Sequence, residues 1–219
     1  MLLPDDPDTG LTLRAAMDAA EARHHPYPHW LLTDMLPLKV VQAIGALPLA
    51  PPAITDSLGR RETHNSCRLF FGAEAQARFP VCRDVVAALQ SPVTVAHLAR
   101  QTGAALSGSY LRVEYCLDTD GFWLEPHTDI GAKFFTMLIY LSDPPDGEDW
   151  GTDIYERPDR HIGSAPARTN GGLVFVPSTT SWHGFIRRPI TGVRRSLIVN
   201  YVTPEWRARH ELAFPEQPV

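Results

Sequence analysis

Apolar and polar side chains alternate most clearly between residues 110 and 118. The alternating positions are Leu111, Val113, Tyr115 and Leu117 in one phase and Arg112, Glu114 and Cys116 in the other. A period of two is typical of a strand that buries one face. Longer apolar runs predict three further strands, at residues 134–141, 173–176 and 196–202.

The first hundred residues have a helical pattern that prolines interrupt. Helices are expected over residues 11–23, 35–47 and 84–100, with Asp34 as a cap of the second and Pro92 as a point where the third divides. Short strands are expected among them at residues 30–32 and 67–71. Helices followed by many short strands predict an α+β fold, with a jelly-roll core and N-terminal helices packed outside it.

Length and composition narrow the class of protein. A chain of 219 residues suits a single domain, in which residues 1–108 form a helical support and residues 109–203 form the β core. The net charge of −5 argues against nucleic acid as a partner. The three cysteines form no CxxC pair, so neither a zinc knuckle nor a disulfide framework is indicated.

The chain shows no sign of export or of membrane insertion. Its first ten residues contain prolines and aspartates in place of a charged and then apolar signal segment. No run approaches the roughly 18 consecutive apolar residues that a membrane-spanning helix needs. We therefore expect a cytoplasmic protein without a membrane partner.

The sequence His127-Thr128-Asp129, followed much later by His183, is the strongest chemical signal. Residues two apart on a strand project from the same face, so His127 and Asp129 are expected side by side. Two imidazoles and one carboxylate can occupy one triangular face of an octahedral iron(II) site and leave the three opposite coordination positions open. His127, Asp129 and His183 are therefore the candidate metal ligands and catalytic residues.

An arginine follows the candidate ligands at the start of the last predicted strand. Arg194 shares one face of that strand with Ser196 and Ile198, whereas Arg195 lies on the other face. An ionised arginine directed into a barrel is unfavourable unless an anion meets it. Arg194 is therefore a candidate anion-binding residue of the same site.

Together these segments resemble the iron(II)- and 2-oxoglutarate-dependent dioxygenases, especially the branch that includes the prolyl hydroxylases. The matching segments are HTD at 127–129, SWHGF around His183 and GVRRSLIVNY from Gly192. The resemblance extends from Leu111 to Val202, under half of the chain. It implies a double-stranded β-helix, which is a kind of jelly roll, and an oxidoreductase that hydroxylates its substrate.

The resemblance also assigns roles to individual residues. Fe(2+) would be bound by His127, Asp129 and His183, and the co-substrate 2-oxoglutarate by Arg194 with Ser196. Tyr115 and Tyr140 stand where family members contact 2-oxoglutarate, although both are equally suited to be core tyrosines. O2 would be the oxidant, and succinate and CO2 the products of 2-oxoglutarate. The Asp149–Tyr155 segment departs from the family's Gly-Gly pattern, so a bent strand with substrate-facing acidic residues is expected there.

The substrate is less constrained than the reaction. Charged and aromatic residues are expected around the pocket mouth: Arg112, Trp123, Glu125, Lys133, Trp150, Asp153 and Trp182. Charges of both signs suit a small molecule such as an amino acid or a related metabolite. Alternatives are a peptidyl or protein hydroxylase of the same family, a cupin-like metal enzyme that does not use 2-oxoglutarate, and a catalytically silent binding protein. Cupins usually show His-x-His with a nearby glutamate, which this chain lacks.

Overall fold

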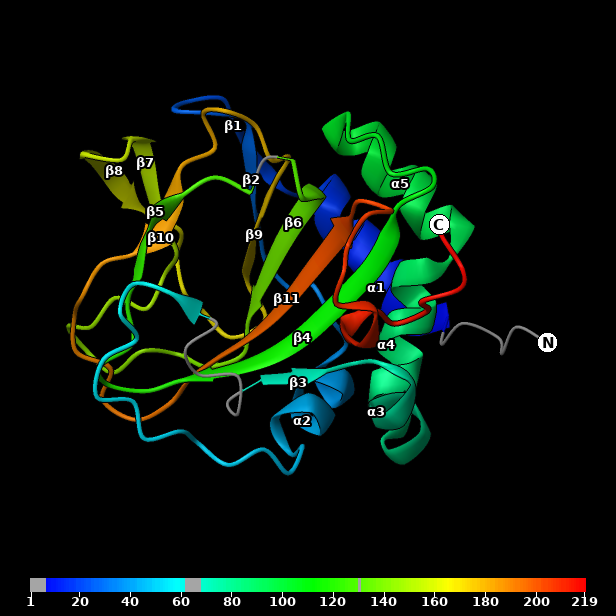
Figure 1. The fold of residues 1–219 in the computed structure, drawn as a ribbon, viewed down its shortest axis with the longest axis horizontal. Coiled ribbons are helices and arrows are strands. Elements are labelled where there is room, and N and C mark those ends of the chain that lie inside the picture. Colours follow the sequence, from blue (N-terminus) through cyan, green and yellow to red (C-terminus); the bar gives the residue numbers. More distant parts are fainter. Residues whose placement is uncertain (1–6, 62–67, 130) are drawn as a thin grey trace.

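The structure, a computed structural model, describes residues 7–61, 68–129 and 131–219 and contains two antiparallel sheets and a set of helices (Figure 1). The helices are α1 (Pro7–Asp18), α2 (Leu38–Gly45), α3 (Ala73–Arg78), α4 (Pro80–Gln90), α5 (Pro92–Thr102) and the short 3₁₀ helix η2 (Arg209–Glu211). The strands are β1 (Glu21–Arg23), β2 (His29–Leu32), β3 (Arg68–Phe70), β4 (Tyr110–Asp118), β5 (Leu124–His127), β6 (Lys133–Tyr140), β7 (Asp153–Arg157), β8 (Arg160–Ser164), β9 (Gly172–Phe175), β10 (His183–Phe185) and β11 (Arg194–Val202).

The two sheets have different sizes. The large sheet has the strand order β1-β2-β9-β6-β11-β4-β3, and the small sheet has the order β5-β10-β7-β8. All of the neighbouring strands in both sheets are antiparallel. From β4 onward the chain passes back and forth between the sheets, so that residues far apart in sequence meet in the space between them.

One face of the large sheet is covered by helices. Leu111, Val113 and Leu117 of β4 pack there with Val86 and Leu89 of α4 in the main apolar cluster, and all of these side chains are buried. Burial of each large aliphatic side chain contributes roughly 1.5–3 kcal/mol. Figure 1 shows α1, α4 and α5 on this side and the small sheet on the other side. We call this side of the large sheet the helix-covered face.

The opposite side of the large sheet, which we call the pocket face, turns towards the small sheet. A second apolar cluster joins the sheets, with Leu138 and Ile198 from the large sheet and Ile154 and Phe185 from the small one. Charged and polar residues occupy the rest of this face. The cluster thus fixes the spacing of the sheets while leaving room for a polar site beside it.

Most of the expected strands are present with shifted ends. The strands expected at 30–32, 111–117, 134–141, 173–176 and 196–202 correspond to β2, β4, β6, β9 and β11. The strand expected at 67–71 corresponds to β3, although Cys67 lies outside the described residues. The strands β5, β8 and β10 were not expected, because each is too short to show a period of its own.

The helices differ more from the expectation. The first ends at Asp18, and residues 21–23 form β1 instead of continuing it. The prediction that Asp34 caps the second helix is wrong: Asp34 has a left-handed φ of 53°, and α2 begins after Pro37. The expected division at Pro92 is present, since α4 ends at Gln90 and Pro92 opens α5, where its missing N–H is tolerated.

The first 108 residues also contribute to the β structure. Strands β1 and β2 extend one edge of the large sheet, and β3 forms the other edge by pairing with β4. This part of the chain is therefore more than a helical support. Among the described residues, the structure contains no helix with the length and hydropathy needed to span a membrane.

Candidate metal centre

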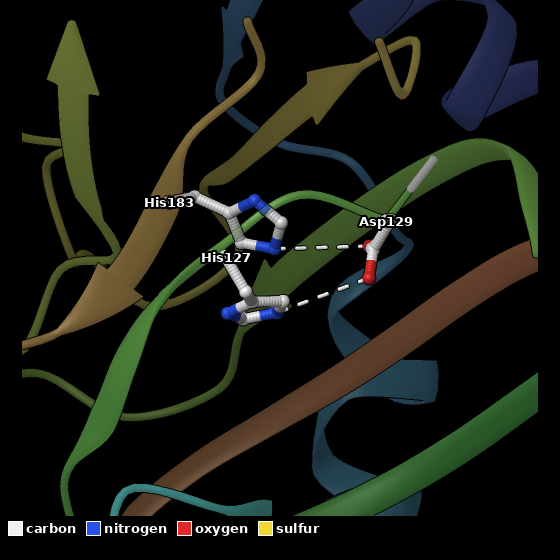
Figure 2. Close-up of side chains that lie close together, drawn as sticks. All are labelled: His127, Asp129 and His183. Carbon is white, nitrogen blue, oxygen red and sulfur yellow. Dashed lines mark ion pairs between the residues drawn. The ribbon is translucent and has the colours of Figure 1, made fainter. Parts of the chain in front are cut away.

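His127 and His183 are placed opposite each other by strand pairing. The two histidines are direct partners in the antiparallel pair β5–β10, and their ring centroids are 4.2 Å apart. Asp129 follows two residues after His127 and reaches the same point (Figure 2). One donor atom from each residue lies within 4.8 Å of the other two, and no other such group of three occurs among the described residues.

The pair His127 and Asp129 does not share a strand face, as the sequence had led us to expect. β5 ends at His127, so Asp129 lies beyond the strand. The backbone carbonyl of Asp129 accepts a hydrogen bond from the Lys133 N–H at 3.2 Å. A turn into β6, and not strand alternation, therefore directs the carboxylate towards the imidazoles.

Both imidazoles are oriented by the backbone. Nδ1 of His127 lies 2.9 Å from the Glu125 carbonyl, and Nδ1 of His183 lies 3.0 Å from the Ser181 carbonyl. A carbonyl oxygen only accepts, so Nδ1 carries the proton in each ring. The Nε2 lone pairs are then free, and they point at Asp129 from 3.8 Å for His127 and 3.7 Å for His183. This is the tautomer that coordination of a metal through Nε2 requires.

The protonation states also suit a metal. Burial lowers the pKa of His183 to about 4, so this imidazole is neutral at neutral pH. Burial alone would raise the pKa of the Asp129 carboxyl, but Lys133 and the two histidines outweigh it and hold that pKa well below its usual range. A neutral nitrogen donor and an ionised oxygen donor thus face one another before any metal binds.

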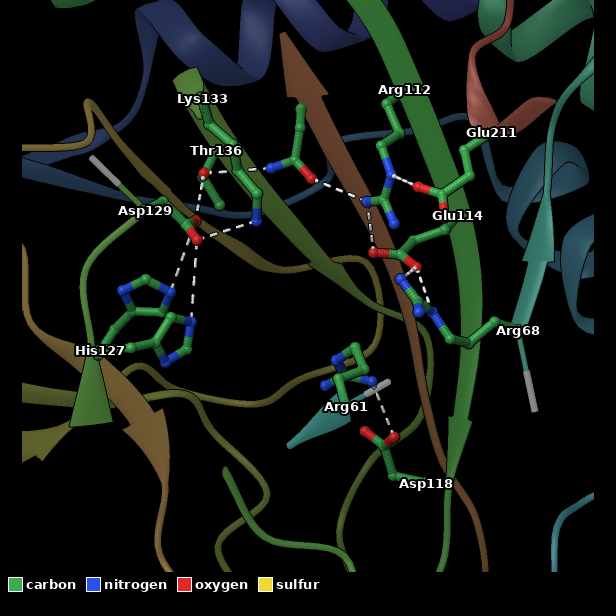
Figure 3. A network of polar contacts seen from close by, with 12 residues as sticks. Arg61, Arg68, Arg112, Glu114, Asp118, His127, Asp129, Lys133, Thr136 and Glu211 are labelled. Atoms are coloured by element: carbon green, nitrogen blue, oxygen red, sulfur yellow. Dashed lines mark hydrogen bonds and ion pairs between the residues drawn. The ribbon is translucent and has the colours of Figure 1, made fainter. Parts of the chain in front are cut away.

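A chain of polar contacts holds the Asp129 carboxylate (Figure 3). Lys133 Nζ lies 3.0 Å from Oδ1, and the Thr136 hydroxyl donates to Oδ2 at 3.0 Å. Thr136 in turn accepts from the Asn200 amide at 3.1 Å, and the Asn200 carbonyl oxygen accepts from Arg112 at 3.2 Å. Partners of this kind fix the direction of a metal-binding carboxylate.

Arg194 lies on the pocket face but is already paired. Its Nη1 donates to Asp118 Oδ2 at 2.5 Å, and its Nε donates to the Trp150 carbonyl at 2.7 Å. Asp118 is its direct neighbour across the β11–β4 pair. Arg194 lines the cavity next to the three candidate ligands, so an anion there would meet an arginine that also contacts an aspartate.

Ser196 and Tyr140 lie beside Arg194 on the same face. The Ser196 hydroxyl is fully buried and has no hydrogen-bond partner among the described residues. Tyr140 is directly opposite Ser196 across the β11–β6 pair, and its hydroxyl lies 3.0 Å from that of Thr152. The Arg194 guanidinium lies 5.9 Å from the centre of the Tyr140 ring.

Tyr115 is not at the pocket, contrary to the expectation that it contacts 2-oxoglutarate. It pairs with Leu197 and shares the helix-covered face with Val113, where it is buried in the main apolar cluster. Its phase in the β4 alternation is that of the apolar residues, which was visible in the sequence. Tyr115 is a core tyrosine.

A cavity of about 610 Å³ runs past the candidate ligands. Arg194 and Phe185 line one part of it, and Arg112 and Glu211 line another. Of the residues expected at the mouth, the cavity is lined by Arg112, Glu125 and Lys133, whereas Trp123, Trp150, Asp153 and Trp182 do not line it. β7 is irregular beside Ile154, as expected, but Asp153 pairs with Arg188 at 3.0 Å instead of facing the cavity.

The structure adds buried ion pairs that the sequence analysis did not assign. Glu114 accepts from Arg68 at 2.6 Å and from Arg112 at 2.8 Å, and Arg112 also donates to Glu211 at 2.6 Å. Three of these four residues lie far apart in sequence, so no local spacing reveals them. The available signal was the charged phase of β4, a strand in the interior of a sheet.

Comparisons with known proteins find similarity in structure only. No family model matches the chain, and no curated protein matches it in sequence. A Pseudomonas putida prolyl-4-hydroxylase superposes with a TM-score of 0.56 at 16% identity, covering 87% of this chain and 94% of that one. A Phytophthora capsici prolyl 4-hydroxylase gives a TM-score of 0.56 at 13% identity, covering 95% of this chain and 68% of that one.

A third similar structure is a prolyl hydroxylase from Trichoplax adhaerens in complex with a peptide fragment of hypoxia inducible factor. Its TM-score is 0.54 at 13% identity, and the match covers 91% of each chain. At such identities the similarity concerns the fold. The chain therefore has the mixed helical and antiparallel β fold of the prolyl hydroxylases.

Proposed function

We propose that this protein is an iron(II)- and 2-oxoglutarate-dependent dioxygenase. In this proposal the strands β4 to β11 form a double-stranded β-helix, or jelly roll. The alternation of these strands between the two sheets supports that assignment. The fold shared with prolyl hydroxylases supports it independently.

The observation that carries the proposal is the convergence of His127, Asp129 and His183. Their donor set of two nitrogens and one oxygen is the one that non-haem iron(II) oxygenases use, and it leaves coordination positions open. In this assignment the Nε2 atoms and the Asp129 carboxylate hold the iron. The backbone carbonyls of Glu125 and Ser181 orient the imidazoles.

Arg194, Ser196 and Tyr140 are assigned to the co-substrate. The buried Ser196 hydroxyl lacks a partner, which is unfavourable unless a ligand supplies one. Arg194 would hold the distal carboxylate of 2-oxoglutarate, and the apolar walls around Phe185 would exclude water. When bound, iron(II) and 2-oxoglutarate supply the O2-dependent hydroxylation of an unactivated C–H bond, with release of succinate and CO2.

The proposed substrate is a small molecule, such as an amino acid or a related metabolite. The cavity beside the metal site is lined by charges of both signs, including Arg68, Glu114 and Lys133. Such a lining suits a zwitterion better than an apolar compound. A peptidyl hydroxylase is the second candidate, because one structure of the same fold is a complex with a peptide.

Oxygen uptake tests the reaction. Purified protein with iron(II) and ascorbate is expected to consume O2 and to form succinate only when 2-oxoglutarate is added. Oxygen uptake that is independent of 2-oxoglutarate would favour the cupin-like alternative. The absence of both iron binding and oxygen uptake would favour a silent binding protein.

Substrate-stimulated succinate formation separates the two substrate classes. Free amino acids and related metabolites are expected to stimulate succinate release, whereas proline-containing peptides are not. Stimulation by peptides alone would replace the small-molecule proposal by the peptidyl hydroxylase.

A further inference from the structure

A single buried carboxylate lies between two arginines at one end of the cavity. Asp118 Oδ1 accepts from Arg61 Nη1 at 2.9 Å, and Oδ2 accepts from Arg194 Nη1 at 2.5 Å. The Asp118 side chain is 0% exposed. Figure 3 shows the Arg61 side chain directed towards Asp118, and Arg61 belongs to none of the strands of the two sheets. We call Arg61, Asp118 and Arg194 the arginine–aspartate cluster.

Each guanidinium of the cluster rests on a phenylalanine. Arg61 lies 4.6 Å from the centre of the Phe122 ring, and Arg194 lies 4.7 Å from the centre of the Phe185 ring. The two rings contact each other, with centroids 5.7 Å apart. Arginines stacked on aromatic faces and fixed by a common carboxylate have little freedom left, so the cluster is preorganised.

The charges of the cluster do not cancel. Two guanidiniums and one carboxylate leave one positive charge in a largely buried place. Burial alone would lower the pKa of Arg61, but Asp118 and other nearby acidic groups outweigh it and raise that pKa. An uncompensated buried charge is unfavourable unless a ligand of opposite charge meets it.

The positive charge faces the cavity. Arg61 and Arg194 both line it, whereas Asp118 does not and thus lies behind them. A ligand entering the cavity meets guanidinium N–H groups before it meets the aspartate. A planar carboxylate is the ligand group best suited to these two arginines, since guanidinium and carboxylate groups match in hydrogen-bonding shape.

From this arrangement we propose that Arg61 is a second binding residue for the distal carboxylate of the co-substrate. Asp118 is a positioning residue that holds both arginines in place. The inference rests on the proposed function and extends it, because Arg61 lies outside every segment on which the resemblance is based. With Arg61 included, the cluster neutralises the distal carboxylate in spite of Asp118. Without Arg61, Asp118 would cancel the charge of Arg194.

The test compares two 2-oxo acids that differ only at the distal end. Binding of 2-oxoglutarate and of 2-oxopentanoate, which has a methyl group in place of the distal carboxylate, is measured by anaerobic calorimetry on the iron(II)-loaded protein. Arg61→Met is expected to weaken 2-oxoglutarate binding about ten- to a hundredfold, the range for a charged hydrogen bond. It is expected to leave 2-oxopentanoate binding unchanged.

A double variant separates direct contact from charge compensation. Asp118→Asn combined with Arg61→Met restores one net positive charge but not the hydrogen bonds of Arg61, so it is expected to recover only part of the affinity for 2-oxoglutarate that Arg61→Met loses. If Arg61→Met weakens both acids equally, Arg61 has only a structural role and the inference fails. If the double variant binds 2-oxoglutarate as tightly as wild type, Arg61 only offsets the charge of Asp118 without contacting the ligand, and the inference also fails. Arg61→Lys keeps the charge and is expected to recover part of the lost affinity.

Arg187→Met is the matched control. Arg187 also stacks on an aromatic ring, at 5.2 Å from the centre of Trp123, and pairs with an aspartate, Asp56, at 2.7 Å, but it does not line the cavity. This variant is expected to bind both acids as wild type does; selective loss of 2-oxoglutarate binding in it would contradict the inference. A wild-type protein that binds neither iron(II) nor 2-oxoglutarate would overturn the proposed function as well.

Discussion

The two faces of the large sheet are built from the same strands but have opposite character. Along β11, Leu197, Val199 and Tyr201 enter the helix-covered core, whereas Arg194, Ser196 and Asn200 face the pocket. Along β4 the same division separates apolar from charged positions. Strand alternation therefore lets one pair of strands stabilise the fold with one face and build a site with the other.

The two faces of the large sheet also differ in how much their side chains contribute to the stability of the fold. Apolar side chains on the helix-covered face gain free energy from burial. The ion pairs of the pocket face are also buried, and buried ion pairs are often no more stabilising than apolar residues of the same size. Their concentration along a cavity, around three metal-ligand candidates, is consistent with a binding role in place of a stabilising one.

The largest expected effect comes from removing a ligand on the pocket side. Asp129→Ala or His183→Ala should abolish iron(II) binding, because two remaining donors hold the ion far less firmly and the helix-covered face cannot compensate. Calorimetric titration with iron(II) under anaerobic conditions measures the loss, and circular dichroism checks that each variant is folded. A variant that retains wild-type metal affinity would remove that residue from the ligand set.

The next prediction compares the loss of stability caused by substituting two neighbouring residues of β11, one on each face of the large sheet. Leu197→Ala should lower the free energy of unfolding by about 2–5 kcal/mol, because it leaves a void in the closed apolar core. Ile198→Ala should lower it less, because Ile198 borders a cavity that already exists. Urea denaturation of the metal-free proteins measures both values. Equal losses would mean that the two faces contribute equally to stability.

Acidification should destabilise the metal-free protein through His183, which lies on the pocket side. His183 has a pKa of about 4 in the folded state because of burial, against an ordinary value of 6.5. Between these pH values the unfolded chain takes up a proton that the folded protein does not. Stability should therefore fall as pH decreases from 6.5 to 4, by on the order of 3 kcal/mol from this residue.

His183→Gln is the control for this pH dependence. Denaturant unfolding in the presence of a chelator should show a smaller loss between pH 6.5 and 4 in the variant than in wild type. Parallel pH profiles of the two proteins would show that burial does not keep His183 neutral.

A smaller effect on metal affinity is expected when the hydrogen bond that holds the Asp129 carboxylate is removed. Thr136→Val removes the hydroxyl that donates to Asp129 while it preserves the shape of the side chain. The affinity for iron(II) should fall about ten- to a hundredfold, as is typical for partners of metal ligands. Thr136→Ser keeps the hydroxyl and should bind as wild type does. Calorimetry distinguishes the variants, and identical affinities would show that Thr136 does not orient Asp129.

The sequence predicted the features that depend on the spacing of residues within one segment of the chain. Strand alternation in β4 and β11 gave the division of the two faces, and the HTD segment with His183 gave the three residues that the structure brings together. Tyr115 lies on the opposite face from the one that the resemblance implies, because its apolar phase along β4 places it in the helix-covered core.

Contacts between residues that lie far apart in the sequence could not be predicted from local patterns. Arg61 and Asp118 are 57 residues apart in sequence and form an ion pair at 2.9 Å, and no periodic pattern encodes that contact. The position of Asp129 beyond the end of β5 likewise depends on where pairing with β10 stops. Such positions follow from tertiary packing, which local propensity does not determine.

A crystal structure of the protein grown anaerobically with iron(II) and 2-oxoglutarate tests the central claim most directly. The account predicts one iron ion within bonding distance of His127 Nε2, His183 Nε2 and an Asp129 carboxylate oxygen, with the co-substrate directed towards Arg194. An iron ion bound elsewhere, or no ion between these three side chains at saturating iron(II), would contradict it.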